Sequence, residues 1–501
     1  KTNIFQINLK KTTLIIFTFF INFLLTAQEK KKIDIKNADF TYINNDKHPD
    51  YWRLIGDVNI YHNKTDMFCD SAHYYSEKEK IIAFKNVKIT KGDSINLYGE
   101  KLNYDGEKSI AVISKNVVFK NSNSNLKSNQ LTYNINEEKI FYVTRSSIVK
   151  NEKNISSNEG VFFVEENKYE FRDSVILKSE KYFAKTDNLI FLEDENLNYL
   201  IGPSKIFFDD KTIYCEEGNL YNDKAEFYKN SYIQNNDIKI NADSIFYDDL
   251  IKSLNTFGNV ILTDTINNMI LSGEEADFFE NEEKMIFKKK PLLKLISDSD
   301  TLFISANRFE NFIMNDKNII KAFNEVKFTN DNIIGKCDSL TYYKSDSIIT
   351  MYNNPIIWLD EYQVFSDTIR INYFDKKINK MYLDSKPMII SNLDSLEYNQ
   401  IKGKIMIGNF KDNKLKTMNV SGNGQSIYFL KEKEETIGMN YLESSSINLH
   451  FIDKKINNIN YEVIPHSLTT PIEDLKNEDR FLKEFEWRIK EKLTKKEIIN
   501  Q

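Results

Sequence analysis

The stretch IGDVNIYHNKTDMFCDSAHYY, residues 55–75, decides the fold because both of its halves recur along most of the chain. The second half, MFCDSAHYY (67–75), has counterparts such as LYGEKLNYD (97–105) and INADSIFYD (240–248), and eleven copies lie between residues 67 and 372. The commonest step is 29 residues, and the other steps lie between 27 and 33. A period of this size over most of a chain predicts a solenoid or array built from one repeated unit.

The first half of the stretch predicts a β-strand. IGDVNIYH (55–62) recurs as AFKNVKIT (83–90), ISKNVVFK (113–120) and TFGNVILT (256–263). Alternation of β-branched or aromatic residues with polar ones is typical of half-buried strands, so each repeat should hold two strands of about ten residues. Turns such as Asp105-Gly106 favour antiparallel hairpins over a parallel β-helix.

The alternation changes phase inside each repeat. In LKSNQLTY the apolar or small residues are Leu126, Ser128, Leu131 and Tyr133, so the spacing is two, three and two. A slip of one residue sends the rest of a strand to the opposite face unless the strand bends there. We therefore expect a corner, with the strand continuing along a facing wall. The residue before the corner is small in every copy: Cys69, Gly99, Ser128, Ser157, Thr186, Cys215, Ala242, Gly273, Ala306, Cys337 and Ser366.

All three cysteines of the chain belong to this small series. Successive cysteines lie five and four repeats apart, and neighbouring repeats of two strands rise by about 9–10 Å. A disulfide needs Cα atoms within about 7 Å. The sequence therefore predicts small buried residues rather than disulfides within one straight array.

No catalytic or metal-binding group stands out. His62, Cys69, Asp70 and His73 do not converge, because strand alternation turns His73 outward where Cys69 points inward. The polar residue after the small one is Asp or Glu in some copies but Asn in others, as at Asn129, which suits a turn and not a general acid or base. No nucleotide, hydrolase or metalloprotease motif is present. We expect no enzyme activity, no metal and no cofactor.

The inward positions form a series of aromatic and aliphatic residues. Two interpretations stay open: a filled core, or a continuous apolar trough that takes acyl chains. For the second, the candidate groove residues are Tyr74, Tyr104, Leu131, Tyr133, Phe162, Phe191, Ile245, Tyr247, Phe278 and Tyr342.

The N-terminus is typical of an exported protein. Lys10 and Lys11 precede the apolar run 12–27, which ends at Ala27. A basic flank, an apolar core and a small residue predict a signal peptide over residues 1–27. The alternative is an uncleaved anchor, although the run is shorter than the roughly 20 residues that span a bilayer. The net charge of −6 argues against a nucleic-acid partner.

The repeated pattern resembles the OstA-like family, which includes LptA and the N-terminal domain of LptD in lipopolysaccharide transport. The local matches are Gly56-Asp57-Val58-Asn59-Ile60 with 69–75, and Gly258-Asn259-Val260 with 242–247. The resemblance extends over about residues 35–460. It implies a mainly β fold, an elongated V-shaped antiparallel β-jellyroll or solenoid of hairpin repeats, whose apolar interior carries the acyl chains of lipid A.

The expected organisation is a signal peptide (1–27), an OstA-like array (28–465) and a charged helical tail (466–501). The tail is predicted to form a helix over 478–499, with Phe481, Phe485 and Ile489 on one face.

The resemblance also implies a periplasmic protein that carries lipopolysaccharide from the inner to the outer membrane. The implied partners are lipopolysaccharide or lipid A and the other components of a transport bridge. End-to-end self-association and an association with the outer membrane stay open. The alternative function is that of a structural or adhesive exported solenoid with a packed core and no lipid.

Overall fold

The computed structural model describes residues 32–43, 50–92, 95–121, 124–150, 152–297, 300–314, 317–374, 377–394, 396–433, 435–464 and 466–500. The expected signal peptide lies outside these residues. The chain divides into two compact units, the first ending at Asn196 and the second beginning at Leu197. In the described residues no helix is long and apolar enough to cross a membrane.

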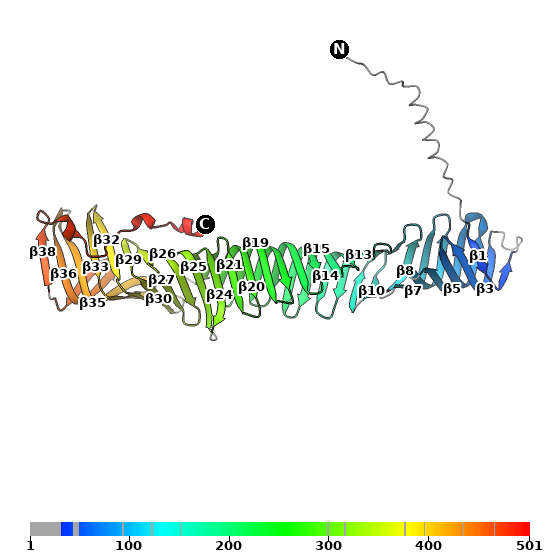
Figure 1. Ribbon diagram of the computed structural model, residues 1–501, viewed down its shortest axis with the longest axis horizontal. Coiled ribbons are helices and arrows are strands. Elements are labelled where there is room, and N and C mark those ends of the chain that lie inside the picture. Colours follow the sequence, from blue (N-terminus) through cyan, green and yellow to red (C-terminus); the bar gives the residue numbers. More distant parts are fainter. Residues whose placement is uncertain are drawn as a thin grey trace, which may run out of the picture. The chain divides into compact units, whose positions relative to one another are not determined.

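Unit 1 is made of antiparallel strands, most of which pair with the next strand in the chain (Figure 1, blue to cyan). The strands are β1 (Asp34–Asn37), β2 (Phe40–Tyr42), β3 (Trp52–His62), β4 (Thr65–Tyr75), β5 (Lys80–Lys91), β6 (Ile95–Asp105), β7 (Ile110–Asn121), β8 (Ser124–Asn134), β9 (Lys139–Tyr142), β10 (Ser146–Lys150), β11 (Lys153–Ser157), β12 (Glu159–Phe163), β13 (Lys168–Lys178) and β14 (Phe183–Leu192), with a 3-10 turn, η1 (Ser76–Lys78), after β4. Where strands are split at the corner the order differs, since β8 pairs with β10 as well as β9, and β9 pairs with β12.

Unit 2 continues the same pattern and ends in a segment with little regular structure. Its first strands are β15 (Leu197–Phe208), β16 (Lys211–Leu220), β17 (Lys224–Gln234), β18 (Ile238–Asp248), β19 (Ser253–Asp264), β20 (Met269–Phe279), β21 (Lys284–Lys288), β22 (Leu292–Ile296), β23 (Thr301–Ser305), β24 (Arg308–Met314), β25 (Lys317–Thr329) and β26 (Ile333–Tyr343). The later elements are β27 (Ile348–Tyr352), β28 (Ile356–Leu359), β29 (Tyr362–Phe365), β30 (Thr368–Phe374), β31 (Lys377–Asp384), β32 (Met388–Asp394), β33 (Glu397–Lys402), β34 (Ile405–Lys411), β35 (Lys414–Glu432), β36 (Glu435–Ile452), β37 (Lys455–Glu462), β38 (His466–Pro471), η2 (Asn477–Arg480), η3 (Ile489–Glu491) and α2 (Lys495–Ile499).

Each repeat is an antiparallel hairpin that bends at a corner. The hairpin β5–β6 pairs Ile81 with Tyr104 on one side of the corner and Ile89 with Leu97 on the other. Between these segments two residues of β5, Lys85 and Asn86, and one residue of β6, Glu100, are unpaired. A bulge of this kind bends the strand and restores the inward face after the phase change. The corner predicted from the spacing is therefore present.

The bend of the corner is made by residues in the left-handed backbone conformation, on its solvent-exposed side. Lys85 and Asn86 have φ of +63° and +47°, and Lys115 and Asn116 repeat this at +69° and +52°. Asn tolerates this conformation better than most residues because its short polar side chain can bond locally. The Lys-Asn pair of the repeated sequence Lys-Asn-Val therefore turns the chain.

This Asn also bonds the acidic residue of the preceding strand. Asn86 Nδ2 donates to Asp70 at 3.0 Å, and Asn259 Nδ2 donates to Asp243 at 2.9 Å. The polar residue after the small one thus fastens the corner to its neighbour, which confirms its structural role. The same bond recurs at Asn230–Glu216, Asn353–Asp338 and, with the residues exchanged, Asn158–Asp173.

The core lies between the two walls that meet at the corners. Phe119, from β7 on one wall, and Phe162, from β12 on the other, approach with ring centroids 5.4 Å apart. Both side chains are almost completely buried. The predicted fold class, an antiparallel β-jellyroll of hairpin repeats with a short C-terminal helix, is confirmed.

The helix expected over 478–499 is wrong except for α2 at its end. Gln363 donates to the backbone oxygen of Glu486 and accepts from the amide of Arg488. Gln400 does the same with Arg480 and Leu482. These side-chain amides bind backbone groups that a helix would have used internally, so the segment forms only two short 3-10 turns before α2.

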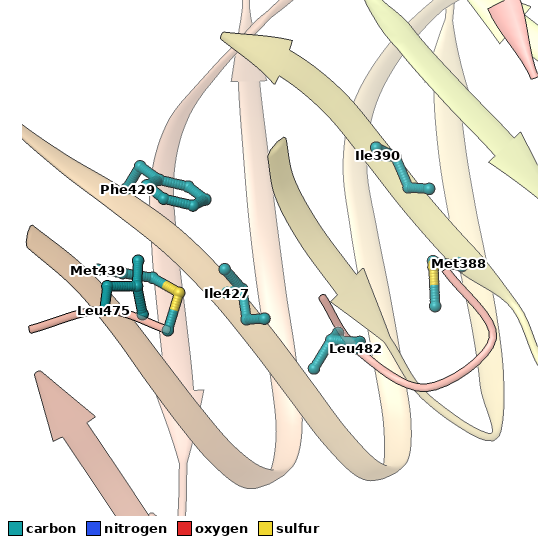
Figure 2. Packing of buried hydrophobic residues seen from close by; sticks show 7 residues of the cluster. All are labelled: Met388, Ile390, Ile427, Phe429, Met439, Leu475 and Leu482. Atoms are coloured by element: carbon teal, nitrogen blue, oxygen red, sulfur yellow. The ribbon is translucent and has the colours of Figure 1, made fainter. Parts of the chain in front are cut away.

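The residues that precede α2 form an additional apolar layer in unit 2. Leu475 and Leu482 are buried with side chains of β32, β35 and β36 (Figure 2). Phe485 and Trp487 pack against the same cluster. The apolar residues that suggested a helix face therefore belong to an irregular segment, which we call the C-terminal strap (residues 472–494).

Candidate functional site: the interior between the two walls

The predicted groove residues occupy the interior, and most of them are fully enclosed. Eight are buried: Tyr74, Tyr104, Leu131, Tyr133, Phe162, Phe191, Ile245 and Phe278. Tyr247 and Tyr342 are partly exposed. Sequence alternation thus identified which residues face inward, but it gave no information on which of them a ligand can reach.

In unit 1 the interior is packed. Leu97, Phe119 and Tyr133 have no exposed surface, and Phe162 stacks on Tyr169 with ring centroids 4.2 Å apart. Protein interiors are close-packed and leave few voids larger than a water molecule. An acyl chain can occupy this interior only if the walls separate.

The walls of unit 1 are joined by polar contacts at the mouth, the edge opposite the corners. His62 Nδ1 and the Tyr104 hydroxyl form a hydrogen bond between the tip of β3–β4 and β6. Ser124 Oγ and the Tyr169 hydroxyl lie 3.0 Å apart between β8 and β13. Ion pairs join Lys91 to Glu138 and Lys150 to Glu193. These polar contacts join the two walls at the mouth, outside the apolar interior.

Unit 2 has a section in which the interior is less enclosed. Ile240 of β18 occupies the repeat position of Leu97, and Ile233 of β17 that of Ile89. Leu97 and Ile89 are fully buried, whereas Ile233 and Ile240 are partly exposed. Ile213, Ile238 and Tyr247 are partly exposed as well. We call these five residues of β16–β18 the open section.

Two local features explain the open section. Ser231 stands where Val87 and Val117 stand in unit 1, so the inner wall is less bulky there. Within the described part of the chain, no side chain of the turn between β17 and β18 (residues 234–238) bonds to the facing wall. Ion pairs across the mouth do occur at the neighbouring hairpin tips. Lys211, at the start of β16, pairs with Glu280, and Asp264, at the end of β19, pairs with Lys344.

Two hollows among the described residues differ from a lipid-sized cavity in the interior. One of about 830 Å³ lies on the outer side of the corner of β16–β18 and has polar walls, including Glu216, Glu217 and Lys229. A second, between the walls near Phe328 and Met351, measures about 10 Å³. That is room for about one water molecule.

The cysteines are free and buried. Burial, with a smaller effect of Asp70, raises the pKa of Cys69 to about 12, and burial raises the pKa of Cys215 to about 12. A thiol that stays protonated is neither a nucleophile nor a metal ligand. Their interpretation as small interior residues is confirmed.

His73 and Cys69, two of the residues weighed as metal ligands in the sequence, lie on opposite faces of β4. His73 stacks on Tyr51 with ring centroids 4.2 Å apart, while Cys69 is buried on the inner face. Among the described residues, no group of three or more His, Cys, Asp or Glu side chains could hold a metal ion.

Sequence reasoning missed the mouth contacts. Lys91 and Lys150 lie at hairpin tips, where a lysine is usually interpreted as a solvent-exposed turn residue. The signal was present in the alternation, since Lys150 continues the inward positions Ser146 and Ile148. A charged residue in an inward position predicts a buried partner.

Two family models match the chain. Residues 30–187 match the family described as OstA-like protein. Residues 220–377 match the family described as LptA/(LptD N-terminal domain) LPS transport protein. The resemblance seen in the repeats is confirmed over these two ranges.

Solved structures similar to the chain include the crystal structure of LptH from Pseudomonas aeruginosa. It is described as the LptA homologous periplasmic component of the conserved lipopolysaccharide transport device. The two sequences are 10% identical, the match covers 30% of this chain and 82% of that chain, and the TM-score is 0.15. No curated protein matches the sequence significantly.

Proposed function

We propose that the protein is a periplasmic module of lipopolysaccharide transport, and that the acyl chains of lipid A lie between its two walls. The family matches in both units support the general function. The observation that carries the finer proposal is the open section, where apolar residues that are enclosed in other repeats reach the surface.

An acyl chain suits the open section because of the apolar surface there. Ile213, Ile233, Ile238 and Ile240 lie on one wall and Tyr247 on the other. Removing apolar surface from water stabilises a complex by roughly 25 cal/mol per Å². A flexible alkyl chain can follow the interior from this section without forming directional bonds, which polar sugars would need. The open section is thus the proposed point of entry or exit.

The module is proposed to work as part of a protein bridge between the inner and outer membranes. The first strands of unit 1 offer a surface for association, since Phe40 and Tyr42 of β2 are 60% and 57% exposed. Edge strands present unpaired backbone groups that another strand can pair with. Association of one module with another, or with membrane-bound components, would use such edges.

Photo-crosslinking tests the proposal. A photoreactive amino acid replaces Ile240 in the open section, Tyr133 in the closed interior, or the exposed Lys127 on the outer face of β8. We expect a lipopolysaccharide adduct in cells at Ile240, a weaker one at Tyr133 and none at Lys127.

The alternative function, a structural or adhesive solenoid, predicts a different result. Ile240 would then give only protein adducts or none, and protease added to intact cells would degrade the protein. Failure to capture lipid at Ile240 in a folded protein would overturn the proposed function.

A further inference from the structure

Two lysines face each other at the mouth of unit 1, in a place where a pair of like charges is unfavourable. Lys150 ends β10 and Lys153 begins β11, and they are direct partners in the register of this hairpin. Like charges directly opposite on neighbouring strands destabilise a sheet. Other hairpin tips of unit 1 combine residues that do not repel, for example His62 with Thr65 and Lys91 with Ile95.

Both lysines point toward the interior rather than into solvent. The side chain of Lys150 is 4% exposed. The ammonium group of Lys150 lies 5.9 Å from the centre of the Phe191 ring, and that of Lys153 lies 5.8 Å from the same ring. The two charges therefore approach one aromatic residue of the facing wall.

The charges in this cluster do not balance. Lys150 forms an ion pair with Glu193. Lys153 donates to the amide oxygen of Asn196 at 3.1 Å, which is a neutral partner. Among the described residues no carboxylate forms an ion pair with Lys153. Burial also lowers the pKa of Lys153, because the charged form loses hydration.

Lys153 is partly buried, and a partly desolvated positive charge without a counter-ion is unfavourable, so an anion would stabilise it. An ammonium group has three donors. Lys153 uses one of them on Asn196, and apart from Glu193 no described residue accepts a hydrogen bond from Lys150. A phosphate group carries up to two negative charges and three acceptor oxygens, which matches two lysines better than a second carboxylate does.

We propose that Lys150 and Lys153 form a binding site for the phosphate group of an amphiphile whose alkyl chain lies between the walls of unit 1. The residues beside the site favour this class of ligand, because Ile155, Tyr169 and Phe191 give it an apolar wall. The site rests on the proposed function, since it needs an acyl chain to enter the interior. It adds a specific contact for the charged head group of the lipid.

The site is tested by binding of dodecyl phosphate and of dodecyl maltoside, a neutral amphiphile with the same chain, to the full-length protein by calorimetry below their micelle concentrations. The variant Lys153→Gln removes one charge and leaves the Lys150–Glu193 pair intact. The control Lys127→Gln removes a charge from the exposed face of the neighbouring strand β8. Inorganic phosphate serves as the probe without a chain.

We expect Lys153→Gln to weaken dodecyl phosphate binding about tenfold, which corresponds to about 1.4 kcal/mol, and to leave dodecyl maltoside binding unchanged. Lys127→Gln should change neither. Equal losses for both amphiphiles, or no loss, would overturn the site. Inorganic phosphate that binds as tightly as dodecyl phosphate would overturn the amphiphile as its ligand.

The result also separates this inference from the proposed function. If the wild-type protein binds neither amphiphile, the proposed function fails together with the site. If it binds both and Lys153→Gln has no effect, only the lysine site fails. A second variant, Lys150→Gln with Glu193→Gln, removes the ion pair without leaving a buried charge, and it should show the same selective loss while its thermal midpoint reports on folding.

Discussion

Asn86 is a single residue on which the shape of a repeat depends. It turns the chain with φ of +47° and bonds Asp70 of the preceding strand. A non-glycine residue pays roughly 1–2 kcal/mol in the left-handed conformation unless a local bond compensates. The repeated Lys-Asn-Val sequence is therefore explained by backbone geometry and by a side-chain bond together.

Two substitutions at Asn86 separate these contributions. Asn86→Ala removes the bond and leaves an unfavourable backbone conformation, so it should lower the free energy of unfolding by about 1–2 kcal/mol. Asn86→Gly removes the bond but has no steric cost at positive φ, and its loss should be smaller. Urea denaturation of both variants measures the difference. Equal losses would show that backbone conformation contributes nothing at this corner.

The C-terminal strap has only short 3-10 turns and is held in place mainly through side chains. The side-chain amides of Gln363 and Gln400 bind backbone groups of the strap, and the side chains of Leu475 and Leu482 are buried against unit 2. Periodicity predicted a helix here because it counts apolar residues along one chain and ignores the surface that they contact.

Leu482→Ala tests how much the strap contributes. Truncation of a buried leucine costs about 2–5 kcal/mol, so the strap should detach in a larger fraction of molecules. Trypsin should then cleave after the exposed Lys483 faster than in the wild-type protein. Lys476→Ala, at an exposed position of the same segment, serves as the control and should not change the rate of cleavage at Lys483. An unchanged cleavage rate in Leu482→Ala would show that the backbone bonds hold the strap alone.

For the whole molecule, sequence periodicity predicted the elements and the inward faces but not the degree of enclosure. Leu97 and Ile240 occupy the same repeat position, yet the side chain of Leu97 is fully buried and that of Ile240 is partly exposed. The difference comes from contacts between strands far apart in the sequence, such as Lys91–Glu138 at the mouth. The repeat pattern shows only which positions face inward in all copies. How deeply a side chain at such a position is buried depends on the particular residues of the facing wall.

The buried thiols give both units a common response to alkaline pH. Burial raises the pKa of Cys69 in unit 1 and of Cys215 in unit 2 to about 12, from an ordinary value of 9.0. Between these values the unfolded chain loses the thiol protons while the folded protein keeps them. The unfolded state therefore binds fewer protons, and stability falls as pH rises through this window.

The urea midpoint of the wild-type protein should accordingly decrease from pH 9 toward pH 11. The variant with Cys69→Ser, Cys215→Ser and Cys337→Ser should lose less over the same range, because serine does not ionise there. Buried tyrosines such as Tyr142, whose pKa burial raises to about 12, account for the decrease that remains in the variant. If wild type and variant declined in parallel, the thiols would have to be accessible to water in the folded protein, and the corners that contain them would be open.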